Sequence, residues 1–454
     1  MKRRRTSRAF AYILTLILLS IMMTLAAAMT NSSALSMISS SNLSDAARAR
    51  LSAESGLAFL LTRMRGMRLG ADTTEATFAA NMAAALGPRL NGTSNLAGAA
   101  VTAGAQSVTV PAIATPDGSF SAVIAWCGPN RCRVSVAGSA RGLTRNISIE
   151  LLLVPRNSAA FNYGLASRGP LSISGSARIL GVNSPSEASI LSATTSDAVA
   201  VSLAGSAIVA GDATVVQDPR FMVISGSPSL GGTSNPLLMA QHIHAVAEPP
   251  DFPQVDVTTL APLATNRLTT QPPNQVATLT NIRIAAGLNP VFNNDVVING
   301  IIYVEAPNNV RFEGKAVING MVVTEPSNQP LSACTLRFAG NVEAYGVETL
   351  PATAEFAAIR AKTGTFVLAP GFDVTFAGNF SAINGTIAAD KLTFTGTATG
   401  TVKGAVIGLA PETTSVGGNV DILVDRQNAS SNPAGFVQTF TLTPQGATYR
   451  EGGS

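Results

Sequence analysis

The chain has 454 residues, of which 46% are hydrophobic and only 12% are charged. This composition excludes an intrinsically disordered chain, which needs few apolar residues and a high net charge. Residues 1–68 hold ten of the 30 basic residues and two of the 26 acidic ones, so the rest of the chain has a net charge of −4. We therefore expect no basic face for nucleic acid and no nucleic-acid partner.

The N-terminal charge precedes an apolar segment. A basic leader, residues 1–8, is followed by residues 9–30, and at about 1.5 Å per residue the apolar run from Ala9 to Met29 spans the roughly 30 Å hydrocarbon core. A cationic leader keeps the N-terminus in the cytoplasm. This predicts one transmembrane helix in the cytoplasmic (inner) membrane, with the bulk of the chain periplasmic or extracellular. A cleaved secretory signal ending at Ala26–Ala28 is the alternative.

Residues 31–69 predict an amphipathic extension of the same helix. Its side chains that recur at helical spacing form a stripe for packing against other helices: Leu43, Ala47, Leu51, Glu54, Leu57 and Leu61. A carboxylate on such a stripe needs a partner, and Arg50, one turn before Glu54, is the candidate.

Residues 70–160 predict a small α+β region with a four-stranded meander over residues 101–154. Cys127 and Cys132 flank a tight turn between two of these strands. Four intervening residues allow the Cα separation of a disulfide, and an exported location would preserve it, so we expect a bridge.

The run Ala46-Ala47-Arg48…Ala53-Glu54-Ser55-Gly56-Leu57-Ala58, behind a basic leader and an apolar span, resembles the N-terminus of PilX-type minor pilins. Related N-termini occur in pseudopilins of type II secretion, and the resemblance covers about residues 1–155. It implies packing with other pilin-like subunits or an assembly platform. The major-pilin pattern would put a processing site at Ala9-Phe10, although Leu14 stands where that pattern has glutamate.

From residue 161 an apolar residue is repeatedly followed by a glycine eight to ten residues later, and Val297-Ile-Asn-Gly returns as Val317-Ile-Asn-Gly. A period near twenty predicts a β-solenoid, with blocks at 161–232 and 283–425, a Pro-rich connector or insertion at 233–282, and a C-terminal strand and tail at 426–454. This part resembles polymer-forming or adhesin-type right-handed parallel β-helices. An antiparallel sandwich is the competing fold.

In the solenoid, the first apolar residue of each copy should point into the core, and the glycine should lie at a bend. The expected core residues are Ile173, Leu203, Ile224, Phe292, Phe312, Phe338, Phe376 and Phe394. Ile298 and Ile318 should pair across adjacent parallel strands. The fold class is thus mainly β, with a membrane-spanning helix, a pilin-like head and a β-solenoid.

Other candidate sites are few. His242 and His244 would share one face of a strand and could bind a metal with Glu248 or Asp251, but the segment fits a surface loop, and we expect no metal and no cofactor. The alternating run Thr393 to Thr401 would share one strand face. Such a face could meet an extracellular surface or glycan, or could only reflect β-propensity.

These patterns favour a non-catalytic structural subunit of the cell envelope, a minor-pilin-like component of a type IV pilus or type II secretion-like filament. A membrane-anchored β-helical adhesin outside any filament is the alternative. A third class is a carbohydrate-active β-helix enzyme, but the acidic residues of the solenoid are scattered singly, and paired carboxylates are what that chemistry needs. We therefore expect no enzyme.

Overall fold

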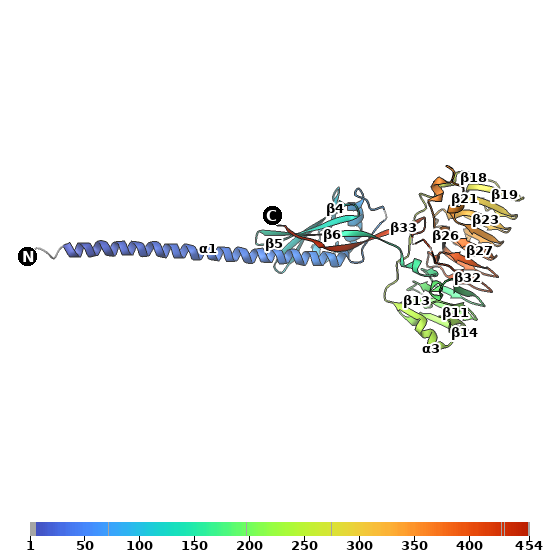
Figure 1. The fold of residues 1–454 in the computed structure, drawn as a ribbon, viewed down its shortest axis with the longest axis horizontal. Helices are drawn as coiled ribbons and strands as arrows, with labels where there is room; N and C mark the ends of the chain where they lie inside the picture. Colours follow the sequence, from blue (N-terminus) through green and yellow to red (C-terminus); the bar gives the residue numbers. More distant parts are fainter. Residues whose placement is uncertain are drawn as a thin grey trace, which may run out of the picture. The chain divides into compact units, whose positions relative to one another are not determined.

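The computed structural model describes residues 6–70, 72–196, 198–273, 275–427, 429–430 and 432–452 (Figure 1). The chain forms two compact units. Unit 1 comprises residues up to 156 and those from 439 onward, and unit 2 comprises residues 157–438. Unit 2 is therefore inserted between two strands of unit 1, which the linear order of domains expected from the sequence did not include.

Unit 1 consists of a long helix, a short helix and an antiparallel sheet. Helix α1 runs over Thr6–Met64, and α2 over Phe78–Leu90. The seven-stranded sheet has the order β1-β34-β6-β5-β4-β3-β2. Its strands are β1 (Arg68–Leu69), β2 (Thr102–Ala103), β3 (Ser107–Thr115), β4 (Gly118–Gly128), β5 (Arg131–Ala140), β6 (Leu143–Arg156) and β34 (Thr439–Gly452). Strands β3 to β6 are the meander expected from the sequence.

The C-terminal segment differs from the expectation of a short strand and a frayed end. Strand β34 lies antiparallel to β6, with Thr439 opposite Arg156 and Gly452 opposite Asn146. A bulge between Gln445 and Arg450 interrupts the register. The last residues of the described chain therefore complete the sheet of unit 1, next to the strand that precedes the insertion.

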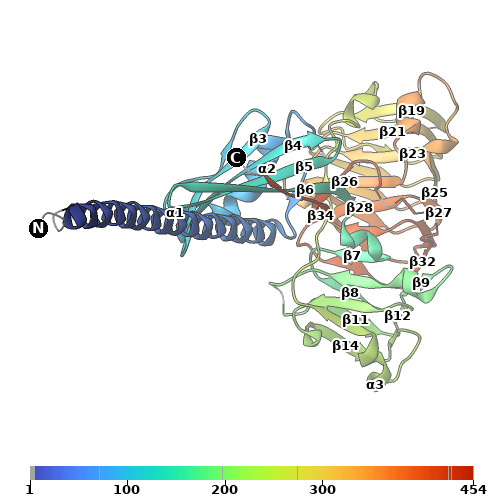
Figure 2. The ribbon, with the colours of Figure 1, turned by 60° about the vertical axis from the view of Figure 1, so that its left-hand side comes forward.

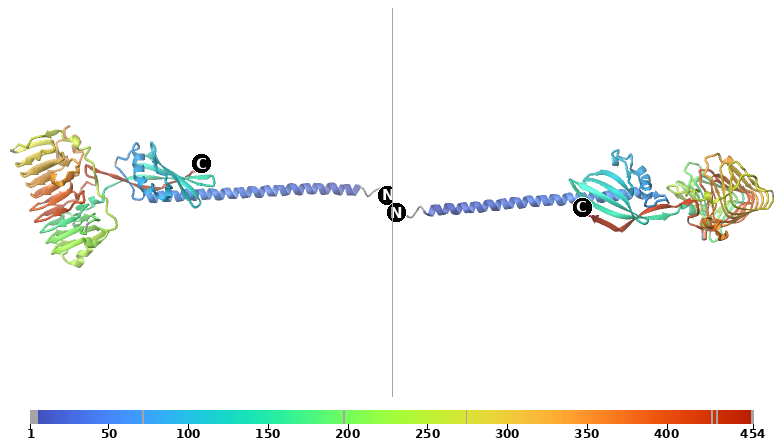
Figure 3. Two further views of the ribbon diagram at one scale, coloured as in Figure 1. Left: turned by 180° about the vertical axis from the view of Figure 1, so that it is seen from behind. Right: turned by 90° about the horizontal axis from the view of Figure 1, so that it is seen from above.

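Unit 2 is built around a 25-stranded sheet whose strands pair in parallel and stack as successive coils, hereafter the coil stack (Figure 2). Each coil contributes strands to three faces. Five strands turn a corner and serve two faces: β19 (Ala277–Ile284), β21 (Val296–Val304), β23 (Ala316–Thr324), β26 (Thr365–Phe376) and β28 (Thr386–Phe394). Seen nearly along its axis, in the right view of Figure 3, the coils superimpose.

The remaining strands belong to one face each. Face A holds β18 (Asn266–Leu268), β30 (Val406–Gly408), β7 (Leu165–Ser167), β10 (Ile190–Ser192), β13 (Ala213–Val216) and β16 (Ile243–Val246). Face B holds β20 (Val291–Phe292), β22 (Asn308–Phe312), β24 (Cys334–Phe338), β31 (Thr414–Val416), β8 (Leu171–Ile173), β11 (Val201–Gly205) and β14 (Met222–Gly226). Face C holds β25 (Val342–Tyr345), β27 (Phe380–Asn384), β29 (Thr399–Lys403), β32 (Asp421–Val424), β9 (Arg178–Gly181), β12 (Ile208–Val209) and β15 (Ser229–Leu230).

The coils do not follow the chain from one end of the stack to the other. The last strands of the second block pair with the first strands of the first block, β30 with β7, β31 with β8 and β32 with β9. The stack thus begins at β18, runs to β32, continues with β7 and ends at β14 to β16. The chain therefore enters and leaves the stack between its two ends. After β16, at one end of the stack, the connector returns the chain to β18 at the other end.

A polar cluster joins the two blocks where they meet. The Glu187 carboxylate accepts hydrogen bonds from the Asn183 N–H at 2.7 Å and the Arg426 N–H at 3.0 Å. The Arg426 guanidinium donates to the carbonyls of Phe161 and Asn162, and the Asn183 amide donates to Asp425 at 3.0 Å. These bonds hold the entry and exit segments of unit 2 together.

The expected core residues form one ladder along face B. Phe292, Phe312, Phe338, Phe376 and Phe394 are buried and successively paired. Their neighbouring rings stack with centroids 4.7–5.1 Å apart and planes within 15°. The ladder continues through Val416, which the repeat analysis missed, to Ile173, Leu203 and the partly buried Ile224.

The matched Val-Ile-Asn-Gly segments pair as expected. Ile298 lies opposite Ile318 in parallel register, which confirms the predicted pairing and excludes the antiparallel arrangement for these strands. Gly300 and Gly320 follow at the corner between faces C and A, and both have positive φ. A Cβ on Gly320 would lie 1.7 Å from the Gly300 carbonyl oxygen, so the two coils can approach at this corner only with glycine.

The Pro-rich connector covers the outer side of face A. Val257, Leu260 and Ala264 are buried there against the outward side chains of face A, among them Tyr303 and Leu368. Strand β17 (Gln254–Val255) of the connector pairs antiparallel with β33 (Phe436–Val437) beside the exit from unit 2. The segment 346–361, with helix α4 (Ala357–Arg360), covers more of the same apolar surface.

Candidate functional site

The C-terminal part of α1 has one buried and one exposed face. Asp45, Ala49, Ser52, Ala53, Gly56, Leu57, Leu60 and Met64 are buried against the sheet of unit 1. Most of the predicted stripe lies on the other face, where Leu43 is 75% and Leu51 53% exposed, and Ala47 is also exposed. Leu61 is half-buried, whereas Leu57 packs inside unit 1 and is unavailable to another molecule. The apolar stripe therefore remains largely uncovered.

Small residues bring the helix close to the sheet on the buried face. A Cβ on Gly138 of β5 would lie 2.2 Å from the Ala49 carbonyl oxygen and 2.3 Å from the Ala53 nitrogen. A Cβ on Gly56 would lie 2.5 Å from the ring of Phe120. The sequence analysis missed this face because alanine, serine and glycine carry little hydrophobic signal. The sequence analysis instead identified the stripe of larger residues, most of which face outward.

The stripe carries an ion-paired glutamate. The Arg50 Nε donates to the Glu54 carboxylate at 3.0 Å, which confirms the predicted partner. The same nitrogen lies 2.7 Å from the Glu451 carboxylate at the end of β34. Arg50 and Glu451 also line an open cavity of about 470 Å³, together with Leu43, Ala46, Ala47, Arg145 and Gly452. Two residues of the stripe, Leu43 and Ala47, thus share a cavity with three charged side chains.

Helix α1 is the one helix in the described residues that is long and apolar enough to cross a membrane, judged by length and composition. Its apolar side chains outside the sheet contact are exposed, including Leu35, Met37 and Ile38. Ala9 and Phe10, the possible processing site, lie within the backbone of α1, but their side chains are outside the described residues. So are residues 1–5 of the basic leader.

The predicted disulfide is not formed, and Cys127 and Cys132 are free. A bulge in β4 leaves Cys127 exposed, and Cys132 pairs across the strands with Trp126 instead. Cys132 points into the core of unit 1, where burial, with a smaller contribution from Cys127, raises the pKa of its thiol to about 12. The prediction was wrong because the spacing permits a bridge but the bulge turns the two side chains apart. Cys334 is buried in unit 2.

His242 and His244 lie at the end of the coil stack and both contact Asp212. The His242 Nδ1 is 2.7 Å and the His244 Nε2 is 3.2 Å from opposite oxygens of that carboxylate. Burial would raise the pKa of the Asp212 carboxyl, but the hydrogen bonds with the two imidazoles outweigh it and lower the pKa. Neither Glu248 nor Asp251 completes a metal site: within the described ranges, no group of three His, Cys, Asp or Glu is arranged to hold a metal ion.

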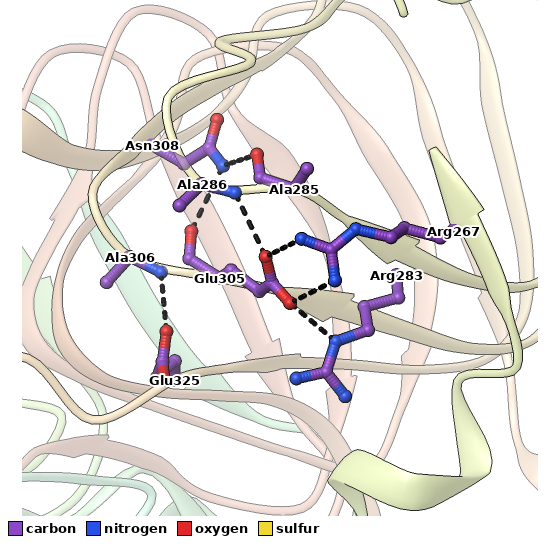
Figure 4. A network of polar contacts seen from close by, with 8 residues as sticks. All are labelled: Arg267, Arg283, Ala285, Ala286, Glu305, Ala306, Asn308 and Glu325. Atoms are coloured by element: carbon purple, nitrogen blue, oxygen red, sulfur yellow. Dashed lines mark hydrogen bonds and ion pairs between the residues drawn. The ribbon is translucent and has the colours of Figure 1, made fainter. Parts of the chain in front are cut away.

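The opposite end of the stack is closed by a buried carboxylate (Figure 4). Glu305 accepts two hydrogen bonds from Arg267, at 3.1 and 2.9 Å, one from Arg283 at 2.6 Å and one from the Ala286 N–H at 3.1 Å. Burial would raise the pKa of Glu305, but these bonds and charges lower it. The Arg283 guanidinium also lies over the ring of Tyr303, 4.9 Å from its centroid. The carboxylate is thus held by two guanidinium groups and one backbone N–H, and the cluster ties β18, β19 and β21 together at this end of the stack.

The alternating threonines do not form one flat face. Strand β28 ends at Phe394, the chain turns with positive φ at Gly396, and β29 begins at Thr399. Thr393 therefore lies on face B, and Thr399 and Thr401 lie on face C. The prediction that these threonines share one strand face is wrong because Gly396 places a corner of the coil inside the run.

Comparisons with known proteins add little. No protein-family model matches the sequence, and no curated protein matches it. Among solved structures, the chain is similar to the competence-associated pilin ComZ from Thermus thermophilus, with 13% identity, a TM-score of 0.25, and coverage of 90% of this chain and 98% of that one. A TM-score of this size does not show a shared fold.

Proposed function

We propose that the protein is a non-catalytic structural subunit of the cell envelope, a minor-pilin-like component of a type IV pilus or type II secretion-like filament. The observation that carries the proposal is the uncovered apolar surface of α1. The helix has 59 residues, a length of about 88 Å, of which a membrane covers roughly 30 Å. The sheet of unit 1 covers one face from Asp45 onward.

Between these two coverings the helix still exposes Leu35, Met37, Ile38 and Leu43. Their positions are distributed around the helix rather than along one side. Serine and asparagine occupy most of the positions between them, so this part of the helix is mixed in polarity, and packing against other helices would bury its four large apolar side chains. Neighbouring helices, from pilin-like subunits or an assembly platform, would provide that burial, and the stripe through Ala47 and Leu51 would continue the contact along unit 1.

We further propose that the coil stack is a parallel β-helix displayed by this subunit and that it performs no catalysis. Several of its carboxylates pair with cations: Asp373 is 2.6 Å from Lys391, Glu343 is 2.8 Å from Lys315, and Glu305 is held by two arginines. Glycoside hydrolysis needs two carboxyl groups flanking one bond. Release of reducing ends from a polysaccharide by the purified protein would contradict this part of the proposal.

Leu51→Glu tests the filament proposal. A charge on the stripe should abolish recovery of the protein in sheared surface filaments, because a carboxylate would be buried between helices without a partner. Val123→Glu, at another exposed apolar position of unit 1, is the matched control and should assemble normally. Wild-type protein that stays in the membrane fraction and never enters filaments would favour the anchored adhesin instead.

Orientation is tested separately. With the N-terminus in the cytoplasm, protease added to spheroplasts should digest residues 70–454 and spare a tag at Met1. Protection of the C-terminal part would refute the proposed single-pass topology in the inner membrane.

A further inference from the structure

A column of polar side chains follows the outer surface of face C along the stack axis. Thr280, Asn299, Asn319 and Tyr345 lie in register on successive coils. The column continues with Asn384, which follows Ile383, the partner of Ala344, and then with Lys403. Successive rungs are one strand spacing apart, about 4.8 Å.

These side chains point outward because their neighbours on each strand point into the core. Ile298, Ile318, Ala344, Ile383 and Val402 are all buried, whereas the column residues are partly or largely exposed. Tyr345 is 46% exposed, and among the described residues of the coil stack it is the one aromatic side chain that is largely exposed. The column therefore presents amides, a phenol ring and an ammonium group at a regular interval.

The amides of the column are oriented. The Asn319 side chain donates to the Asn299 side-chain oxygen at 2.8 Å, and the Asn384 amide donates to Glu348 at 2.9 Å. Each bond uses one amide group and leaves acceptor or donor capacity directed to solvent. The Tyr345 hydroxyl lies 3.4 Å from Glu343, so the ring is held on the surface beside this row.

We propose that this column binds an extended, uncharged glycan lying along the stack. A sugar chain offers what the column complements: hydroxyl groups for the amides at a short regular repeat, and an apolar ring face for Tyr345. An anionic polymer would need several cations, but Lys403 is the single cation of the column. A peptide strand would need a free backbone edge, which the side of a stacked sheet does not present, because its strands are paired on both sides.

The test is retention of the full-length, detergent-solubilised protein on insoluble neutral polysaccharides, cellulose and chitin, with heparin beads as the anionic probe. Wild type should bind at least one neutral polymer, and Tyr345→Ala and Asn384→Ala should each reduce retention at least tenfold. Thr375→Ala, an outward substitution on face B, is the matched control and should bind as wild type. Failure to bind either neutral polymer, retention on heparin alone, or undiminished binding by Tyr345→Ala would each overturn the proposal. None of these outcomes depends on filament assembly.

Discussion

Truncation of the central ring of the phenylalanine ladder should destabilise unit 2 selectively. Phe338 is fully buried, with the rings of Phe312 and Phe376 stacked on its two sides at centroid distances of 5.1 and 4.9 Å. Loss of buried apolar surface and formation of a cavity should lower the free energy of unfolding by about 3–5 kcal/mol for a Phe→Ala substitution. Each aromatic pair accounts for about 0.5–1.5 kcal/mol of such a cost. Phe338→Ala loses three, the two stacked pairs and a tilted one with Phe366 at 6.3 Å. We therefore expect the upper part of that range.

Phe292→Ala is the matched variant. Phe292 is buried in the first rung of the ladder and has one stacked neighbour, Phe312 at 4.7 Å. Phe292→Ala should cost about 1–3 kcal/mol less than Phe338→Ala, since one aromatic pair is lost instead of three. For a unit of this size 1 kcal/mol corresponds to about 2–4 °C, so Phe338→Ala should lower the melting temperature by on the order of 10 °C.

The chain contains an internal reference for this measurement. Its single tryptophan, Trp126, lies in unit 1, and its ring contacts that of Phe78 in a tilted arrangement with the centroids 5.5 Å apart. Circular dichroism should show the transition of the coil stack shifting downward, while tryptophan fluorescence should show an unchanged transition for unit 1. Equal losses for the two variants would refute the stacking argument, and a matching shift of the Trp126 transition would refute the independence of the units.

Three further outcomes are expected. Glu305→Gln should lower the free energy of unfolding by about 1.5–3 kcal/mol at pH 7, which is typical of hydrogen bonds to a charged group. Because the folded pKa of Glu305 is lowered, its contribution to stability is present above the unfolded pKa and is lost as pH falls through the folded pKa. Urea titrations of variant and wild type should therefore converge in acid. Gly320→Ala should destabilise more than Gly287→Ala, since both glycines have positive φ but only the first would bring a Cβ against backbone; equal melting temperatures would contradict the corner assignment. Residues 157–438 expressed alone should give a cooperative transition, because the Arg426 guanidinium ties the entry segment at Phe161 and Asn162 to the end of the second block. An unfolded product would show that unit 2 requires unit 1.

The ladder could be predicted from the sequence because a strand points alternate side chains inward, and a repeat places one of them at the same height in every coil. The burial of Phe292, Phe312, Phe338, Phe376 and Phe394 could therefore be predicted. The joining of the two blocks could not be predicted. Leu165, at the start of the first block, pairs with Val406 near the end of the second, and any apolar strand of the same length would fit that position.

Two errors on unit 1 have a shared physical origin. The stripe through Leu43 and Leu51 was recognised by its large side chains, but the sheet contacts the small ones, because close helix–sheet packing requires residues such as Ala49 and Gly56. Strand β34 was underestimated because its threonines alternate with few apolar residues, and its length comes from pairing with β6. In both cases tertiary contact, not local pattern, determined the structure.

The permuted order of the coils has a consequence for how unit 2 can interact. Neither chain end occupies an end of the stack, so internal segments must close both. At one end the Gln271 side chain accepts from the Val291 N–H and donates to the Leu288 carbonyl, occupying part of the edge of β20, and Glu305 fixes the terminal strands with Arg267 and Arg283. At the other end Met239 of α3 (Pro236–Met239) is buried over the core. Covered ends disfavour end-to-end growth of a sheet. Face A is covered by the connector, so faces B and C are the broad surfaces on which unit 2 can meet a ligand, and the oriented amides and exposed tyrosine lie on face C.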